Sequence, residues 1–142
     1  MGGQAPKGFT VVAVAMVDGE GRILVQRRAA GRAMAGLWEF PGGKLESGET
    51  PEAALVRELG EELGIVVEEA DLEPGPFASA DNGGRHMLLL LFLCRSWRGT
   101  PEALDADALQ WVPPAEMGAM AMPPADVPLV AMLEKLLPAS AA

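Results

Sequence analysis

The sequence predicts a mixed α/β (α+β) sandwich that takes up all 142 residues as a single domain. Short segments rich in Val, Leu and Ile, bounded by Gly and Pro, are typical of strands, and two helical segments introduced by proline lie well apart along the chain. Strands with two separated helices indicate a sandwich rather than a doubly wound sheet. The length suits one domain, and neither a repeat nor a low-complexity linker divides the chain.

The first part of the chain is expected to form two strands around a tight turn. In chain order, the expected segments are a strand at 9–17, a turn at 18–21, a strand at 22–28 that completes a hairpin, a loop at 29–36, and a short apolar segment at 37–40. Pro41-Gly42-Gly43 then breaks the chain sharply, because proline and two glycines disfavour regular structure.

The best-defined element is a helix that begins at Pro51. Thr50 is a good N-cap, Pro51 suits the first helical position, and Glu52 places a negative charge in the first turn. Gly64 suits the position just after the last residue, so the helix is expected to end at Leu63.

The second half is expected to alternate strands with a last helix. The expected segments are extended structure at 65–67, strands at 73–80, 85–97 and 109–112, and an amphipathic helix at 127–137. Pro113-Pro114 ends the last strand, since proline cannot donate to a ladder.

The amino-acid composition limits the kinds of partner that the protein is expected to bind. The formal net charge is −9 and no basic stripe is visible, which disfavours nucleic acid. A small polyphosphate is compatible with this charge only if metal ions accompany it. No apolar run reaches the roughly 18 residues of a membrane span, and the N-terminus lacks a secretory signal, so we expect a cytoplasmic protein without a membrane partner.

The chain has one cysteine, Cys94, and one histidine, His86. A single cysteine excludes an internal disulfide and a multi-cysteine zinc site, and Cys94 is expected to be a small core residue of a strand. Without a Gly-x-Ser-x-Gly motif, the sequence does not favour a hydrolase with a serine nucleophile.

Three carboxylates share one face of the helix at 51–63. Glu58, Glu61 and Glu62 are spaced i, i+3 and i+4, where like charges repel one another. Hard oxygen donors without His or Cys suit Mg²⁺ or Mn²⁺. The alternative is a solvated acidic face. The opposite face carries Leu55, Leu59 and Leu63, which can anchor the helix on a sheet.

The residues around this helix favour a metal face over a solvated one. The loop at 42–49 contains three glycines, which let the backbone approach a metal or phosphate closely. Arg57 can pair with Glu61 at i+4 or reach back to acids of the loop. A P-loop is excluded, because Trp38 stands where its first glycine belongs and Leu45 replaces Ser or Thr.

The motif resembles the Nudix box at every defined position. The matching stretch, at 43–65, is Gly43-x5-Glu49-x7-Arg57-Glu58-Leu59-x-Glu61-Glu62-x-Gly64-Ile65. Segments 26–30, 37–44, 85–86 and 123–129 also resemble the MutT branch, so the likeness covers about residues 8–137. It implies the Nudix fold, in which a mixed β-sheet is sandwiched between helices and the box forms a loop-helix-loop.

The resemblance also implies a metal site. Glu58, Glu61 and Glu62 would bind Mg²⁺ (Mn²⁺ being an alternative), helped by the backbone carbonyl at Gly42, while Glu49 and Arg57 would orient the loop and helix. MutT-type enzymes attack the β-phosphorus of a nucleoside triphosphate and release a monophosphate and pyrophosphate.

The general base has more than one candidate. Glu61 or Glu62 could serve. Some MutT relatives supply a carboxylate from the loop before a Trp-containing strand, and counting back six residues from Trp111 reaches Asp105. Asp is a methylene shorter than the Glu of those relatives, so Asp105 is either a base or a plain turn residue.

Further residues are candidates for substrate contact. Arg28 and Lys44 either neutralise phosphate or are ordinary surface cations, and Arg85 precedes a long apolar strand as in the MutT branch. By resemblance, Phe40 and Asp126 contact the base, although Asp126 is also well placed to cap the last helix.

The substrate expected from these residues is 8-oxo-dGTP, with CTP or a modified dCTP as the alternative. MutT relatives with Pro-Ala-Asp at this point, as at Asp126, include both kinds of enzyme. A catalytically silent nucleotide-binding module is the alternative of another class, although it would not need all three glutamates. The chain is expected to act as a monomer or homodimer.

Overall fold

The computed structural model describes residues 8–137. In chain order its elements are β1 (Phe9–Met16), β2 (Ile23–Arg27), β3 (Trp38–Glu39), β4 (Gly42–Lys44), α1 (Pro51–Leu63), the 3-10 turn η1 (Glu69–Asp71), β5 (Leu72–Asn82), β6 (Arg85–Cys94), β7 (Ala108–Val112), α2 (Pro114–Met117) and α3 (Val127–Leu136). No helix in this range is long and apolar enough to cross a membrane.

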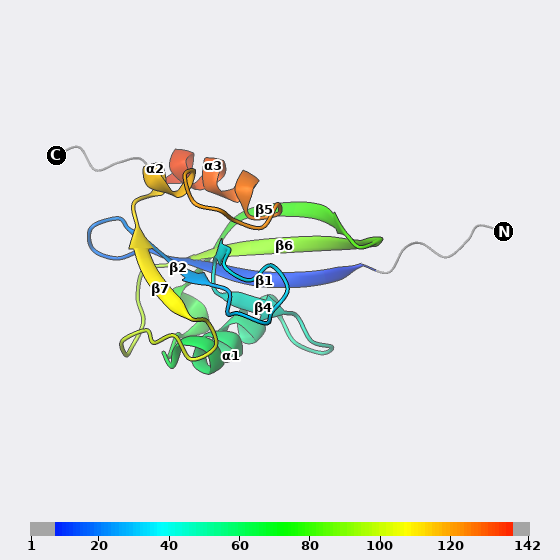
Figure 1. Cartoon of the computed structure of the whole chain (residues 1–142). Coiled ribbons are helices and arrows are strands. Elements are labelled where there is room, and N and C mark those ends of the chain that lie inside the picture. Colours follow the sequence, from blue (N-terminus) through cyan, green and yellow to red (C-terminus); the bar gives the residue numbers. More distant parts are fainter. Residues whose placement is uncertain (1–7, 138–142) are drawn as a thin grey trace.

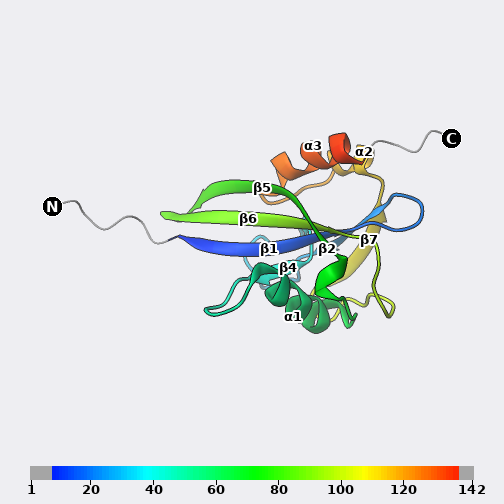
Figure 2. The ribbon, with the colours of Figure 1, turned by 180° about the vertical axis from the view of Figure 1, so that it is seen from behind.

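The strands form two sheets. The larger sheet has the order β4-β1-β6-β5 and is mixed, because β1 pairs parallel with β6 while the other two pairings are antiparallel. The smaller sheet, β3-β2-β7, is antiparallel. Figures 1 and 2 show α1 on one side of the strands and α2 and α3 on the other. The expected mixed α/β sandwich is therefore confirmed, with its strands divided between two sheets.

The prediction that the first two strands form a hairpin is wrong. β1 and β2 belong to different sheets and share only the bridge from Val17 to Ile23 beyond the turn. The reason lies in the edges of β1, which are already occupied by β4 and β6. The turn itself forms as expected, since the Asp18 N–H donates to the Arg22 carbonyl at 3.0 Å.

The chain does not break at Pro41-Gly42-Gly43 but continues into a strand. β4 pairs antiparallel with β1, so that Val12 faces Gly43. A side chain at Gly42 would place its Cβ 2.0 Å from the Val12 carbonyl oxygen, so the missing side chain is what lets the two backbones approach. Two further details differ from expectation: the strand begun at Arg85 ends at Cys94, and the short helix α2 follows Pro113.

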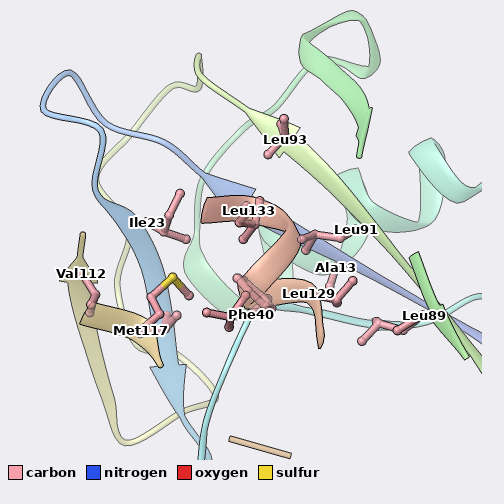
Figure 3. Packing of buried hydrophobic residues seen from close by; sticks show 14 of the residues in the cluster. Ala13, Ile23, Phe40, Leu89, Leu91, Leu93, Val112, Met117, Leu129 and Leu133 are labelled. Carbon is pink, nitrogen blue, oxygen red and sulfur yellow. The ribbon is translucent and has the colours of Figure 1, made fainter. Parts of the chain in front are cut away.

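The larger sheet separates two hydrophobic clusters. On one side Leu55, Leu59 and Leu63 of α1 pack, fully buried, with Val12 and Val14 of β1, as the leucine spacing predicts. On the other side Leu129 and Leu133 of α3 pack with Ala13 and Leu91 (Figure 3). Cys94 is buried in the first cluster, which confirms its expected place in the core.

Candidate active site

A cavity of about 690 Å³ opens between the two sheets, α1 and three loops. At one end it is lined by Glu58, Glu61 and Glu62 of α1 with Gly42 and Gly43. At the other end lie Phe40 and Asp126, together with the apolar side chains of Ala80, Met87 and Leu89. The cavity therefore has an acidic end and an apolar end, and the buried carboxyl group of the apolar end is Asp126.

Residues at its two ends determine where α1, the helix that carries the carboxylates, begins and ends. The Thr50 hydroxyl oxygen accepts from the Ala53 N–H at 3.1 Å, and Pro51 occupies the first turn. Gly64 adopts a left-handed conformation with φ of 68° and its N–H donates to the Gly60 carbonyl. The expected bounds of this helix are thus confirmed.

Glu62 is the most enclosed of the three carboxylates, with 8% of its surface exposed. Its Oε1 accepts from Gln26 Nε2 and its Oε2 from the Gly42 N–H, both at 3.1 Å. Burial, which disfavours the charged form, raises the pKa of Glu62 to about 8, although the hydrogen bond from Gln26 opposes this shift.

Glu58 lies between the helix and the glycine loop. Its Oε1 accepts from Arg57 Nη1 at 2.9 Å, and burial raises the pKa of its carboxyl despite that contact. A Cβ on Gly43 would lie 2.4 Å from the carboxyl carbon of Glu58. The absent side chain at Gly43 therefore makes the space in which this carboxylate sits.

Arg57 joins the loop to the helix, as expected from its spacing. Its guanidinium donates twice to Glu49, through Nε at 2.8 Å and Nη2 at 2.9 Å, a bidentate arrangement that fixes both partners. The same group lies 3.6 Å from Glu61 and 3.7 Å from Glu46. The hydrogen bond from Arg57 lowers the pKa of Glu49.

The acidic end fits a hard divalent cation by its chemistry. Its donors are all oxygens, two of its carboxylates are largely buried, and Gly43 leaves room beside them. As the side chains stand, however, no three Asp, Glu, His or Cys side chains within residues 8–137 converge enough to hold an ion. Glu58 turns to Arg57, and the Glu61 side chain is 63% exposed. Side-chain rotation of Glu58 and Glu61 toward Glu62 would be needed.

Asp105 lines the cavity, as a candidate base must, but it is engaged by another residue. Its Oδ1 accepts from Arg32 Nη2 at 2.6 Å, and Arg32 also lines the cavity. Sequence reasoning missed Arg32, because nothing in its own segment indicates a partner 73 residues away.

The three basic side chains that were candidates for substrate contact lie in different positions. Arg28 and Lys44 line the cavity, but Arg28 Nη1 donates to Glu39 at 2.8 Å, and Lys44 Nζ lies 5.4 Å from the centre of the Phe9 ring. Arg85 is not among the described residues that line the cavity. Its guanidinium lies 4.4 Å from the centre of the same Phe9 ring.

Asp126 does not cap α3 with its side chain, although it is the N-cap residue. Its Oδ2 instead accepts from the Phe40 N–H at 3.4 Å. The carboxyl is only 7% exposed, and burial raises its pKa to about 7, with Glu39 adding to the shift and Arg28 opposing it. Phe40 and Asp126 thus adjoin each other at the apolar end of the cavity.

Comparison with known proteins agrees with this geometry. A family model described as "NUDIX domain" matches residues 6–133. The chain belongs to the NUDIX family. Among curated NUDIX relatives, the protein named 8-oxo-dGTP diphosphatase from Escherichia coli is 39% identical over 88% of this chain and 96% of its own length. The CTP pyrophosphohydrolase of the same organism is 38% identical over 84% and 87%.

Solved structures support the same assignment of this NUDIX domain. The solution structure of the E. coli ORF135 protein superposes with a TM-score of 0.83 at 37% identity, over 96% of both chains. A MutT structure from work on Aliivibrio salmonicida and Vibrio cholerae superposes with a TM-score of 0.77 at 30% identity, over 92% of this chain and 99% of that chain. The resemblance noted in the sequence is therefore confirmed.

Replacement of Gly43 by alanine tests the space beside Glu58. Because the added Cβ would overlap that carboxylate, we expect Gly43→Ala to weaken Mn²⁺ binding to the nucleotide-free protein about tenfold or more. Mn²⁺ titration followed by electron paramagnetic resonance measures this. Gly60→Ala is the matched control, since the nearest atom to its Cβ would be 3.9 Å away. Unchanged Mn²⁺ binding in Gly43→Ala would refute the role assigned to this space.

The raised pKa of Asp126 predicts a specific dependence of stability on pH. Between its ordinary value of 3.8 and about 7, the folded protein holds a proton that the unfolded chain has released. The stability that Asp126 contributes is therefore present at low pH and is lost as pH rises through about 7.

Chemical denaturation of metal-free protein across this pH range measures the effect. The free energy of unfolding of wild type, minus that of Asp126→Asn, should fall as pH rises, because the variant cannot titrate there. Asp81→Asn, at an exposed aspartate, controls for the loss of one carboxyl group. Parallel curves for wild type and Asp126→Asn would contradict the burial argument.

Proposed function

We propose that this protein hydrolyses nucleoside triphosphates to a monophosphate and pyrophosphate with the help of Mg²⁺, and that 8-oxo-dGTP is its preferred substrate. One observation carries this proposal: a single cavity joins the carboxylates of α1 to the apolar end at Phe40 and Asp126. A nucleotide has the same division, with charged phosphates at one end and a flat base at the other.

At the acidic end, Glu58, Glu61 and Glu62 would hold the divalent cation, with the Gly42 carbonyl as a further oxygen donor. When bound, such a cation neutralises phosphate oxygens and lowers the pKa of water. Arg57 keeps Glu58 in the loop-helix junction through its contacts with Glu49. The acidic end thus accepts an anionic substrate only together with cations, in agreement with the net charge of −9.

The chemical step is a substitution at phosphorus. A water oxygen bonds to the β-phosphorus, the bond from that phosphorus to the α–β bridging oxygen breaks, and the monophosphate leaves with the bridging oxygen. A carboxylate of the site takes the proton of the water, and Glu61, Glu62 and Asp105 are the candidates because all three line the cavity. Asp105 would first have to leave Arg32.

At the apolar end, Asp126 is the group able to read the base. With a pKa of about 7, it has both protonated and ionised forms near neutral pH, so it can donate or accept a hydrogen bond. An oxidised guanine offers one N–H donor more than guanine, and cytosine offers an amino group. Relatives named 8-oxo-dGTP diphosphatase and CTP pyrophosphohydrolase are almost equally similar, which makes CTP or a modified dCTP the second candidate.

The remaining expectations, a cytoplasmic location, no nucleic-acid partner, and a monomer or homodimer, stay predictions.

The substrate is tested by initial rates with 8-oxo-dGTP, dGTP, CTP and 5-methyl-dCTP in Mg²⁺, following pyrophosphate release. We expect kcat/KM for 8-oxo-dGTP to exceed the others at least about tenfold. Preference for the cytidine nucleotides would support the proposed reaction but would show that a cytidine nucleotide is the substrate. Binding without turnover of any of them would instead favour a silent nucleotide-binding module.

The acidic face is tested by Glu61→Gln and Glu62→Gln. Each removes one charged oxygen donor from the proposed cation site, so turnover should fall at least about 100-fold while the circular dichroism spectrum stays native. Glu52→Gln, on the same helix but outside the cavity lining, is the matched control. Near-normal turnover in both site variants would overturn the assignment of this helix face.

A further inference from the structure

Gln26 is a buried polar residue whose role is predicted neither by the Nudix box nor by the spacing of the charged residues. It lies on β2 with 2% of its surface exposed, directly after the buried core residues Leu24 and Val25. It also lines the cavity next to Glu62. A buried glutamine in such a strand requires hydrogen-bond partners to offset the loss of water.

Only half of the Gln26 amide finds a partner. Its Nε2 donates to Glu62 Oε1 at 3.1 Å, whereas its Oε1 is the one buried side-chain N or O atom within residues 8–137 that lacks a hydrogen bond. With Glu62 ionised, as a ligand of a cation must be, reversal of the amide would only direct Oε1 at a carboxylate oxygen. An unsatisfied buried oxygen costs free energy, so glutamine is a poor choice here for stability alone.

We infer that Gln26 is a positioning residue that acts through Glu62. The Gly42 N–H holds one carboxylate oxygen of Glu62 and Gln26 holds the other, so the two donors together fix the plane of the carboxylate. Of these two, Gln26 is the one that uses a side chain. Loss of a group that orients a metal-binding carboxylate in this way typically weakens metal affinity about 10- to 100-fold.

This inference rests on the proposed cation-binding role of Glu62, and its test does not need the substrate. Mn²⁺ binding to the nucleotide-free protein, followed by electron paramagnetic resonance, should be about 10- to 100-fold weaker in Gln26→Met than in wild type. Met keeps the volume and unbranched shape of Gln but removes the donor. Gln110→Met is the matched control, because Gln110 is exposed on the neighbouring strand β7.

A double-mutant cycle separates positioning from a general loss of structure. If Gln26 acts through Glu62, Gln26→Met should change Mn²⁺ affinity by less than about threefold in a Glu62→Gln background. The melting temperature of metal-free Gln26→Met should stay within about 4 °C of wild type or rise, since the unsatisfied oxygen is removed as well.

Two results would overturn the inference: unchanged Mn²⁺ affinity in Gln26→Met, or an equal loss in both backgrounds. Neither depends on which nucleotide the protein hydrolyses. A failure to turn over nucleotides would overturn the proposed function while this cycle still tested the link between Gln26 and Glu62.

Discussion

A carboxylate that loses most of its water must find donors in the protein, and Glu62 finds them in two elements far apart in the chain. Gln26 belongs to the smaller sheet and Gly42 to the larger one, so one side chain of α1 is hydrogen-bonded to both sheets. This arrangement couples the site to the fold. A shift of α1 against either sheet would take one of its two donors away from the buried Glu62, so the packing of the leucine face also determines the position of the acidic face.

The second constraint on the site is the crowding of negatively charged carboxylates on α1. Carboxylates one helical turn apart repel one another, and burial adds to that cost. Arg57 offsets part of it, because a single guanidinium contacts Glu49, Glu58 and Glu61. Gly43 contributes only space, which Glu58 fills. Gly42 serves a different purpose, since its missing side chain lets β4 approach β1.

Sequence reasoning succeeded where the physical cause is local. Thr50 and Gly64 cap the helix through contacts within a few residues, and the glutamate spacing determines a shared face without any tertiary contact. It failed where the cause is a distant partner. The strand after the first turn joins another sheet because β4 and β6, which come later, occupy both edges of β1. Gln26 and Arg32 were missed for the same reason, since their partners lie 36 and 73 residues away.

The two ends of the cavity take their carboxyl groups from different elements, which under the proposed function separates the chemical step from the choice of substrate. The acidic end comes from α1 and the glycine loop, whereas the apolar end includes Phe40, just before that loop, and the segment that leads into α3. Relatives with different named substrates resemble the chain almost equally, at 39% and 38% identity, because overall identity follows the scaffold they share. The proposed reading of the base therefore depends on side chains at the apolar end. Asp126, a buried carboxyl held by the Phe40 N–H, can change there from donor to acceptor near neutral pH.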